Sequence, residues 1–316
     1  MPIVPATYGA IRRAAQALAR GEIVAFPTET VYGLGANALD ARAVARVFAA
    51  KERPRFNPLI VHVPGLAEAA EYGLLNATAQ RLAEAFWPGP LSLVLKRRST
   101  CGIADLVSAG LDTLALRAPA HPVAQALLAE AKIPIAAPSA NRSGRISPTT
   151  AAHVEAELGE RPAMILDGDA CPLGIESTVV SVIGDTPSLL RPGAVPREAI
   201  ELVLGAPLAT AAGYERGTSP GQLASHYAPR TTLRLNATSV GAGEALLAYG
   251  PGAPQGARAT INLSESGNLE EAAAKLFAAL RELDQSGAEA IAVMPIPAHG
   301  LGEAINDRLQ RAANRG

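Results

Sequence analysis

Short apolar segments alternate with amphipathic segments of helical spacing from residue 8 to about residue 205. A period near 3.6 residues is typical of helices, and it predicts them over residues 8–20, 40–51, 77–87, 121–131, 149–159 and 196–204. Apolar runs predict strands over residues 22–26, 58–63, 91–96, 113–117, 133–137, 163–167, 176–183 and 187–191. This alternation favours an α/β domain in which helices cover a twisted mixed sheet.

The composition changes after residue 205. Residues 206–230 are rich in Gly, Pro, Ser and Ala, which is typical of a linker. A second set of elements follows, with strands predicted over 231–236, 258–263 and 289–294 and helices over 241–249, 268–285 and 302–313. This βαβαβα order predicts a small unit with a parallel sheet. We therefore divide the chain into a domain of residues 1–205, a linker of 206–230 and a second domain of 231–316.

The totals agree with two folded domains. At 316 residues, each domain is large enough to bury its own core. Hydrophobic residues make up 48% of the chain and charged residues 18%, as in globular rather than disordered proteins. The formal net charge is −1. Strong nucleic-acid binding depends on cations that neutralise phosphates, and this charge balance provides no basis for it.

Several classes of protein are not expected. The two cysteines, Cys101 and Cys171, form neither a disulfide framework nor a Cys-x-x-Cys pair, so a reducing compartment is predicted. The five histidines have no metal-binding spacing, and no Gly-x-Ser-x-Gly motif occurs. The N-terminus lacks the pattern of a signal peptide, and no apolar stretch approaches about 20 residues. We expect a cytoplasmic protein without a membrane span.

A polar, Gly-rich segment from Pro27 to Asn37 follows an apolar run and precedes a predicted helix. At the end of that helix, Lys51 and Arg53 stand just before Pro54. Hydroxyl groups, glycines that permit close approach and paired cations together predict a small anionic ligand. Two interpretations of the cations stay open. They converge on a triphosphate, or they are solvated at a helix C-terminus, where the dipole favours positive charge.

Common nucleotide-binding motifs do not fit this segment. Gly33-x-Gly35-x-x-Ala38 superficially matches the loosened dinucleotide fingerprint. The loop before the glycines is too long, and a polar Lys-Glu-Arg-Pro run stands where a second strand should end. No Gly-x-x-x-x-Gly-Lys-Ser/Thr sequence occurs, which excludes a P-loop NTPase.

Polar residues also follow two other predicted strands. Ser139 and Asn141 come directly after the apolar strand 133–137, where ligands often bind in α/β sheets; an ordinary turn before a helix is the alternative. Arg117 ends an apolar strand and must find an anion, which is either a carboxylate of the protein or one of a ligand. His62 lies on the strand 58–63 and is more typical of a hydrogen-bonded core histidine than of a catalyst.

Taken together, these blocks resemble the YrdC-domain threonylcarbamoyl-AMP synthases, in the longer form with a C-terminal extension. The matching stretches occur in the expected order over almost the whole chain: Pro27 to Asn37, Lys51-Glu52-Arg53-Pro54, Asn57-Pro58-Leu59, Trp87-Pro88-Gly89-Pro90, Arg117-Ala118-Pro119, Pro138 to Gly144, Ser177-Thr178-Val179, Arg191-Pro192-Gly193, Ser219-Pro220-Gly221 and His226-Tyr227-Ala228-Pro229. The resemblance implies a twisted α/β YrdC-like domain, a linker and a small Rossmann-like parallel α/β domain.

The resemblance also implies an activity. L-threonine, bicarbonate or CO2, and ATP condense to threonylcarbamoyl-adenylate and pyrophosphate, and the adenylate feeds threonylcarbamoyladenosine formation beside the anticodon of tRNAs. Threonine is expected to contact Thr30, Tyr32, His62, Arg117, Ala137 and Ser177, with Arg117 holding its carboxylate. ATP is expected to contact Lys51, Arg53, Asn57, Thr113, Ser139, Asn141, Ser147, Arg191 and Tyr227, with residues 219–229 acting as a lid.

The implied chemistry needs Mg2+, held mainly by the ATP phosphates and water. No residue is assigned as general base, so positioning is expected to dominate, with Lys51 and Arg53 taking part in it. A threonylcarbamoyl transferase complex is the expected downstream partner. Two positions depart from the family: Ser181 stands where an acidic residue is common, and Ser225 where a basic one is common. The departure at Ser181 bears on a metal-binding or supporting role at that position. The departure at Ser225 bears on a contact between the lid and the phosphates.

Two alternatives belong to other classes of function. Carbamoyl transfer through a carbamoyl-adenylate occurs in hydrogenase-maturation proteins that contain a YrdC domain, but the Cys-rich zinc segments and acylphosphatase domain expected there are missing. A double-stranded RNA or tRNA-binding protein is the other alternative, against which the charge balance argues.

Overall fold

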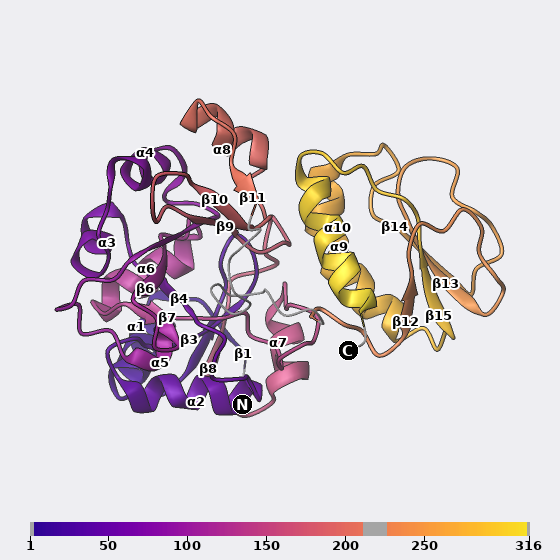
Figure 1. Cartoon of the computed structure of the whole chain (residues 1–316). Helices are drawn as coiled ribbons and strands as arrows, with labels where there is room; N and C mark the ends of the chain where they lie inside the picture. The colour runs from indigo at the N-terminus through magenta and orange to yellow at the C-terminus, as the bar shows by residue number, and fades with distance from the viewer. Residues whose placement is uncertain (1–2, 211–225, 315–316) are drawn as a thin grey trace.

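The computed structural model describes residues 3–210 and 226–314, which form a large and a small α/β unit (Figure 1). The large unit contains a sheet of eleven strands in the order β1-β8-β2-β3-β7-β4-β6-β5-β9-β10-β11. Its strands are β1 (Ile3–Pro5), β2 (Val24–Phe26), β3 (Gly33–Asn37), β4 (Ile60–His62), β5 (Leu91–Lys96), β6 (Thr113–Arg117), β7 (Ile135–Ala136), β8 (Met164–Asp167), β9 (Thr178–Ser181), β10 (Ser188–Arg191) and β11 (Ala209–Thr210). Parallel pairs such as β4 with β6 and antiparallel pairs such as β3 with β7 both occur, so the mixed sheet is confirmed.

Helices cover this sheet. They are α1 (Tyr8–Ala19), α2 (Ala41–Lys51), α3 (Leu66–Tyr72), α4 (Ala77–Phe86), α5 (Asp105–Ser108), α6 (Pro122–Ala131), α7 (Ala151–Leu158) and α8 (Arg197–Leu204). Asp40 caps α2 by accepting a hydrogen bond of 2.8 Å from the Arg42 amide, which satisfies a donor left free at the helix start. The short α3 and α5 and the edge strands β1 and β11 carry too little periodicity for prediction from the sequence.

Strand β3 explains the glycines of the first motif. A Cβ atom at Gly35 would lie 2.7 Å from Ile135 Cγ2 and 2.8 Å from the Phe26 ring, so only glycine fits between these side chains. The sequence pattern did not predict this strand, because glycines carry no side chains whose alternation could reveal two faces. The C-terminal half of the Gly-rich segment is therefore the strand β3, which lies between β2 and β7.

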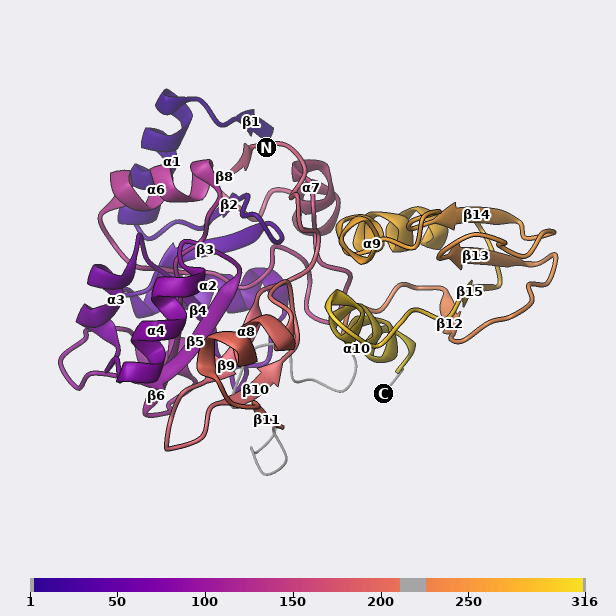
Figure 2. The same ribbon diagram turned by 90° about the horizontal axis from the view of Figure 1, so that it is seen from above.

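The small unit contains a four-stranded parallel sheet in the order β12-β15-β13-β14, which confirms the predicted parallel sheet. Its elements are β12 (Thr232–Arg234), β13 (Glu244–Ala248), β14 (Ala259–Asn262), α9 (Leu269–Asp284), β15 (Ala290–Val293) and α10 (Leu301–Ala313). In two perpendicular views, α9 and α10 lie on the side of this sheet that faces the large unit (Figures 1 and 2). The helices thus stand between the two sheets.

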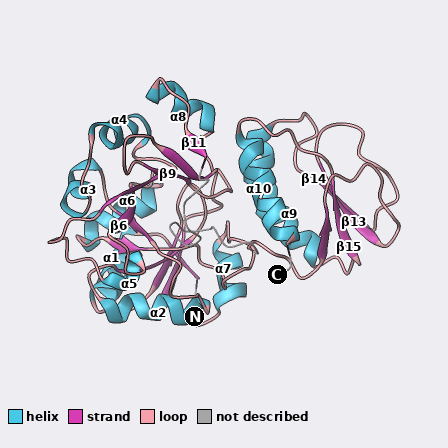
Figure 3. Ribbon diagram, in the orientation of Figure 1, coloured by secondary structure: helices cyan, strands magenta, loops and turns pink. Residues whose placement is uncertain are grey.

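The helix predicted over 241–249 is wrong, because Glu244–Ala248 form the strand β13 (Figure 3). The strand pairs with β14 on one side and β15 on the other, and residues 245–248 are all buried. A central parallel strand is covered on both faces, so its sequence is a continuous apolar run. Such a run cannot be told from a buried helix by periodicity alone.

The two units pack against each other through one hydrophobic cluster. Val31, Ile146 and Ile175 of the large unit belong to the same cluster as Tyr227 and Phe277. Within the stretch predicted as linker, β11 pairs with β10, while residues 211–225, which include Ser219-Pro220-Gly221 and Ser225, lie outside the described residues. The domain boundaries stay a prediction. In the described ranges, no helix is long and apolar enough to cross a membrane.

Candidate functional site

A cavity of about 60 Å3 lies where several strands of the large sheet end. It is lined by Thr28, Thr30, Val31, Gly33, Arg53, Leu59, Ile60, His62, Arg117, Ala137, Pro138, Ser139, Glu176, Ser177, Arg191, His226 and Tyr227. The predicted ligand-binding residues gathered there are Thr30, Arg53, His62, Arg117, Ala137, Ser139, Ser177, Arg191 and Tyr227. We call this cavity the chamber.

The register of the sheet explains the convergence. In the parallel pair β4 and β6, His62 is opposite Arg117, so both side chains come to the same edge of the sheet. Gly33 and Ser139 form an isolated antiparallel bridge, which brings the first motif beside the segment that follows β7. Ligands in open α/β sheets bind at such strand ends. Motifs that are distant in sequence therefore line one chamber.

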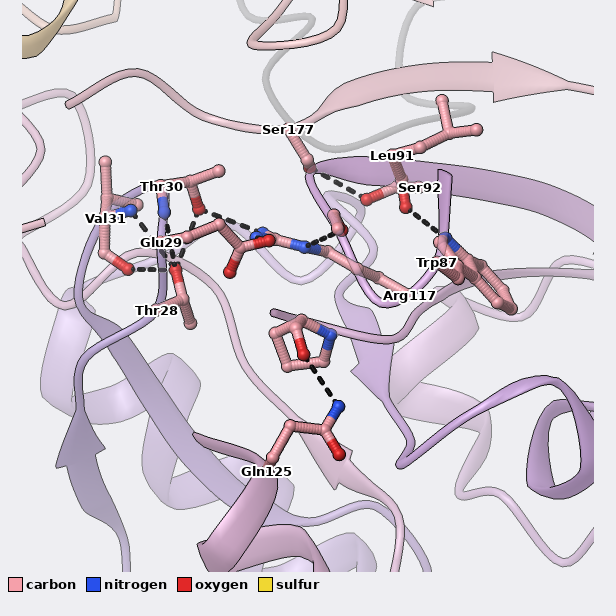
Figure 4. A network of polar contacts seen from close by, with 12 residues as sticks. Thr28, Glu29, Thr30, Val31, Trp87, Leu91, Ser92, Arg117, Gln125 and Ser177 are labelled. Atoms are coloured by element: carbon pink, nitrogen blue, oxygen red, sulfur yellow. Dashed lines mark hydrogen bonds and ion pairs between the residues drawn. The ribbon is translucent and has the colours of Figure 1, made fainter. Parts of the chain in front are cut away.

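Arg117 is buried and makes three contacts with the protein (Figure 4). Its Nη2 lies 2.7 Å from Glu29 Oε1, Nη1 donates to Thr30 Oγ1 at 3.0 Å, and Nε donates to the Gly89 carbonyl at 3.3 Å. Gly89 belongs to the Trp87-Pro88-Gly89-Pro90 stretch, which thereby supports the guanidinium. Sequence reasoning left the anion partner of Arg117 open, and the structure provides a protein carboxylate.

Glu29 was missed by the sequence analysis, although a buried arginine at a strand end required a carboxylate nearby. Burial is the largest single effect and raises the pKa of Glu29, but the charge of Arg117 and the contacts of the carboxylate with Arg117 and backbone amides together hold the pKa below its usual value. The contact is an ion pair in poor hydrogen-bond geometry, because neither Glu29 oxygen nor Arg117 Nη2 has a hydrogen-bond partner among the described residues. Nη2 therefore keeps donor capacity beside the chamber.

A hydroxyl-stabilised turn positions Thr30 against Arg117. Thr28 Oγ1 accepts hydrogen bonds from the amides of Thr30 and Val31, each at 3.2 Å, and lies 2.8 Å from Thr30 Oγ1 (Figure 4). Hydroxyl groups commonly hold their own backbone in such turns. The sequence analysis did not assign Thr28 to the site, yet it lines the chamber and fixes the neighbouring hydroxyl.

Lys51 and Arg53 are both buried, so the interpretation as solvated cations at a helix end is wrong. Lys51 is 1% exposed, and its Nζ donates to the carbonyls of Ser139, at 2.5 Å, and Asn141. Burial and the nearby charge of Arg53 lower its pKa well below the usual value. Lys51 lies behind the chamber lining and ties the end of α2 to the segment after β7.

Arg53 itself faces the chamber. Its Nε donates to the Asn57 carbonyl at 3.2 Å and its Nη2 to the Pro58 carbonyl at 2.9 Å. Burial lowers the pKa of Arg53 to about 9, and the nearby charge of Arg191 contributes in the same direction. Two like charges facing one cavity favour an anionic ligand between them.

Arg191 and Ser177 form a second polar cluster. Arg191 Nη2 donates to the Ser177 carbonyl at 2.7 Å and to Ser177 Oγ at 3.1 Å. Ser177 Oγ also lies 2.8 Å from Ser92 Oγ (Figure 4). Burial is the main cause of the lowered pKa of Arg191. The guanidinium and the hydroxyl thus reach the chamber as one unit.

Six predicted residues lie outside the chamber lining: Tyr32, Lys51, Asn57, Thr113, Asn141 and Ser147. The Tyr32 hydroxyl donates to the Asp169 carbonyl at 2.9 Å, and Asn141 Nδ2 donates to the Arg142 and Arg145 carbonyls.

Ser147 donates to Glu176 Oε1 at 2.5 Å, so its hydroxyl is already engaged. Thr113 begins β6, at the opposite end from Arg117. Asn57 is buried, and its side-chain amide atoms have no hydrogen-bond partner in the described part of the chain.

His226 and Tyr227 form the remaining wall of the chamber. Their ring centroids lie 4.0 Å apart, and the Tyr227 ring stacks on that of Phe277 of α9 with 5.6 Å between the centroids. Tyr227 has a φ of 63°, a left-handed conformation that is strained for a residue with a side chain. Burial and the surrounding cations, Arg53 first among them, lower the pKa of His226 well below its usual value. His226 and Glu176 were not assigned to the site from the sequence.

His62 provides a test of the buried, cationic surroundings. Burial and the charge of Arg117 lower its pKa to about 3, so the folded state keeps this imidazole neutral while the unfolded state protonates it near pH 6.5. The free energy of unfolding contributed by His62 is therefore present above about pH 6.5 and is lost as the pH falls toward 3. We expect a slope of about 1.4 kcal/mol per pH unit from this residue.

Urea unfolding of the wild type and of His62→Gln between pH 4.5 and 6.5 measures this slope. The variant should lose less stability on acidification than the wild type, by about that slope. Taking the difference between the two proteins removes the contributions of the other histidines. Parallel pH dependences would show that His62 titrates normally.

The comparisons with known proteins agree with this architecture. A family model described as "Telomere recombination" matches residues 16–193, and one described as "Threonylcarbamoyl-AMP synthase, C-terminal domain" matches residues 195–314. Threonylcarbamoyl-AMP synthase of Bacillus subtilis is 41% identical over 96% of this chain and 92% of its own length. This chain belongs to the threonylcarbamoyl-AMP synthase family.

Solved structures support the assignment of the family over both units. A Pyrococcus abyssi Sua5 structure, complexed with L-threonine, is 38% identical, covers 97% of this chain and 95% of its own, and superposes with a TM-score of 0.89. A HypF structure in a phosphate- and nucleotide-bound form is 26% identical with a TM-score of 0.51, over 58% of this chain but only 29% of that chain. The likeness to HypF is therefore restricted to part of the fold.

Proposed function

We propose that this enzyme condenses L-threonine, bicarbonate or CO2, and ATP to threonylcarbamoyl-AMP and pyrophosphate, for threonylcarbamoyladenosine formation in tRNA. The observation that carries the proposal is the convergence of Arg53, Arg117 and Arg191 on one chamber that hydroxyl groups also line. Three guanidinium groups suit a ligand set with a carboxylate and a triphosphate. The full-length match to relatives of this name supports the same activity.

We place the threonine at the Arg117 side of the chamber. The unsatisfied Nη2 donor of Arg117 can receive the threonine carboxylate, while Glu29 and Thr30 hold the guanidinium in place. Charge-assisted hydrogen bonds of this kind are about twice as strong as neutral ones. Ser177 and His62 also line the chamber and can contact the remaining polar atoms of threonine, and Ala137 provides an apolar wall.

We place the ATP phosphates at the Arg53 and Arg191 side. In the reaction the threonine amine attacks CO2 to give a carbamate, and a carbamate oxygen then attacks the α-phosphorus of ATP. Pyrophosphate leaves with the electrons of the broken P–O bond, so cations around the leaving group stabilise the developing charge. The protein contributes positioning and charge, with no covalent step.

Mg2+ is part of this proposal as a partner of the nucleotide. In the described ranges no group of three His, Cys, Asp or Glu side chains is placed to hold a metal ion. Glu176 is the one carboxylate of the described lining, and Ser147 and Arg308 already bind its oxygens. These residues fit a metal held by phosphates and water, which neutralises charge on the leaving group. The cytoplasmic location and a downstream transferase that accepts the adenylate stay predictions.

The present size of the chamber requires a movement before ATP binds. A volume of about 60 Å3 holds only a few water molecules. We infer that His226 and Tyr227 move aside to admit the nucleotide and return to their described position once it is bound. Reclosure over the ligands would keep water from the mixed anhydride.

A release assay tests the proposed function. The purified chain, incubated with ATP and Mg2+, should release pyrophosphate only when threonine and bicarbonate are both present, and mass spectrometry should detect the adenylate. Equal release without threonine would remove the substrate assignment. Release with carbamoyl phosphate in place of threonine and bicarbonate would instead support the carbamoyltransferase. Salt-sensitive tRNA binding without any ATP chemistry would support the RNA-binding alternative.

A further inference from the structure

Arg308 is an arginine of the small unit whose side chain is 0% exposed. It lies on α10, yet its contacts reach the large unit. Nε donates to Glu176 Oε2 at 2.8 Å, and Nη2 donates to the Pro192 carbonyl at 2.9 Å. Nη1 bonds to the adjacent Asp307 at 2.5 Å. A guanidinium with donors in fork geometry can serve all three acceptors at once, which a lysine ammonium on one stem cannot do equally well.

Glu176 is the acceptor that connects Arg308 to the chamber. Its carboxylate lines the chamber and is buried, with Oε1 accepting from Ser147 and Oε2 from Arg308. A carboxylate in a site for a polyanion repels the ligand unless a cation compensates it, and the low dielectric of the interior strengthens that repulsion. Arg308 provides this compensating charge from outside the large unit.

Tyr227 is the second chamber residue in contact with Arg308. The guanidinium carbon lies 5.1 Å from the centroid of the Tyr227 ring, within the range of a cation–π contact. The same ring stacks on Phe277 of α9, so both helices of the small unit touch it. Tyr227 holds a left-handed backbone conformation, which persists only where the surroundings stabilise it.

We propose that Arg308 is a positioning residue that the small unit contributes to the nucleotide site: its guanidinium neutralises Glu176 and seats Tyr227. The small unit thereby supports the chamber wall from behind. The inference rests on the proposed function, because its test measures the KM for ATP. It assigns to α10 a role in ATP binding that acts through Glu176 and Tyr227. Arg308 itself makes no contact with the reacting atoms in this scheme.

Steady-state kinetics of the full chain test the proposal. In Arg308→Met, Glu176 loses its ion-pair partner, which should raise the KM for ATP by about 10-fold to 100-fold. Arg308→Lys should fall between this variant and the wild type, because it keeps the charge and loses the fork. Arg311→Met is the matched control: Arg311 lies on the same helix, pairs with the same Asp307 and is not among the residues that line the chamber. Its KM should stay within about two-fold of the wild type.

The decisive comparison is the double variant Arg308→Met with Glu176→Gln. Removing the carboxylate should recover at least about ten-fold of the lost ATP affinity, since the repulsive charge has gone. A purely structural role of Arg308 predicts no such recovery. If Arg308→Met loses its cooperative thermal transition, the KM for ATP is measured in the double variant instead. The double variant should fold, because removing both Arg308 and Glu176 leaves neither charge unpaired in the interior.

Two results overturn the inference. An unchanged KM for ATP in Arg308→Met shows that the chamber does not depend on this guanidinium. Equal KM values in the single and the double variant show that Glu176 is not its target. Both require an active wild type, so a wild type without threonine-dependent pyrophosphate release is a failure of the proposed function and is recognised separately.

Discussion

Replacing Arg117 by methionine is expected to lower kcat/KM for threonine by about 100-fold or more, mostly through KM. The guanidinium provides the cation that we assign to the threonine carboxylate, and no other described cation contacts both Glu29 and Thr30. Loss of a charge-assisted contact in a buried site is costly because water cannot replace it. Pyrophosphate release measured against threonine concentration at saturating ATP gives the value.

The same substitution leaves Glu29 buried beside a neutral side chain, which also destabilises the fold. The double variant Arg117→Met with Glu29→Gln removes both charges and should regain thermal stability without regaining threonine affinity. This pair separates the two effects. An unchanged KM for threonine in either variant would contradict the placement of the carboxylate at Arg117.

Replacing Arg53 by alanine is expected to lower kcat/KM for ATP by about 100-fold, while the KM for threonine changes little. Arg53 faces the chamber with its guanidinium held by the Asn57 and Pro58 carbonyls, so it is oriented before the ligand arrives. Preorganised charge of this kind needs no rearrangement when the leaving group becomes anionic. Initial rates against ATP concentration measure the effect.

Arg55→Ala is the matched control, because Arg55 is an exposed arginine two residues further along the chain. It should retain nearly all of the activity, since exposed charges contribute little. Arg53→Lys should recover part of the loss, as it keeps a cation without the fork. Equal activity of Arg53→Ala and Arg55→Ala would remove Arg53 from the phosphate site.

The sequence was most informative where several residues had to act together. The ordered motifs led to the family and to a mixed α/β fold, and the chamber gathers residues from these motifs, including Thr30, Arg117, Ser139, Ser177 and Arg191. Their roles toward threonine and ATP stay predictions until the variants above are measured. Spacing alone did not decide between a solvated and a buried Lys51, because both leave the same pattern at a helix end.

Errors and omissions arose where a residue's partner is distant along the chain. Glu29 is recognisable as part of the site only through Arg117, and Arg308 only through Glu176, because the two members of each pair come from different segments. The helix predicted over 241–249 is a strand for a related reason: pairing with β14 and β15 on both sides decides its conformation. Local propensity is a weak guide where tertiary contacts choose between two structures.

Local chemistry along the chain was sufficient for many of the elements, the class of fold and the types of group that a carboxylate and a triphosphate require. Burial is a property of the packed molecule. In the folded chain, buried Lys51 donates to the Ser139 carbonyl, and buried Arg308 donates to Glu176. Charges interact strongly only when water is excluded. The pairing of these charges, and with it the contribution of the small unit to the chamber, therefore emerged from the assembled fold.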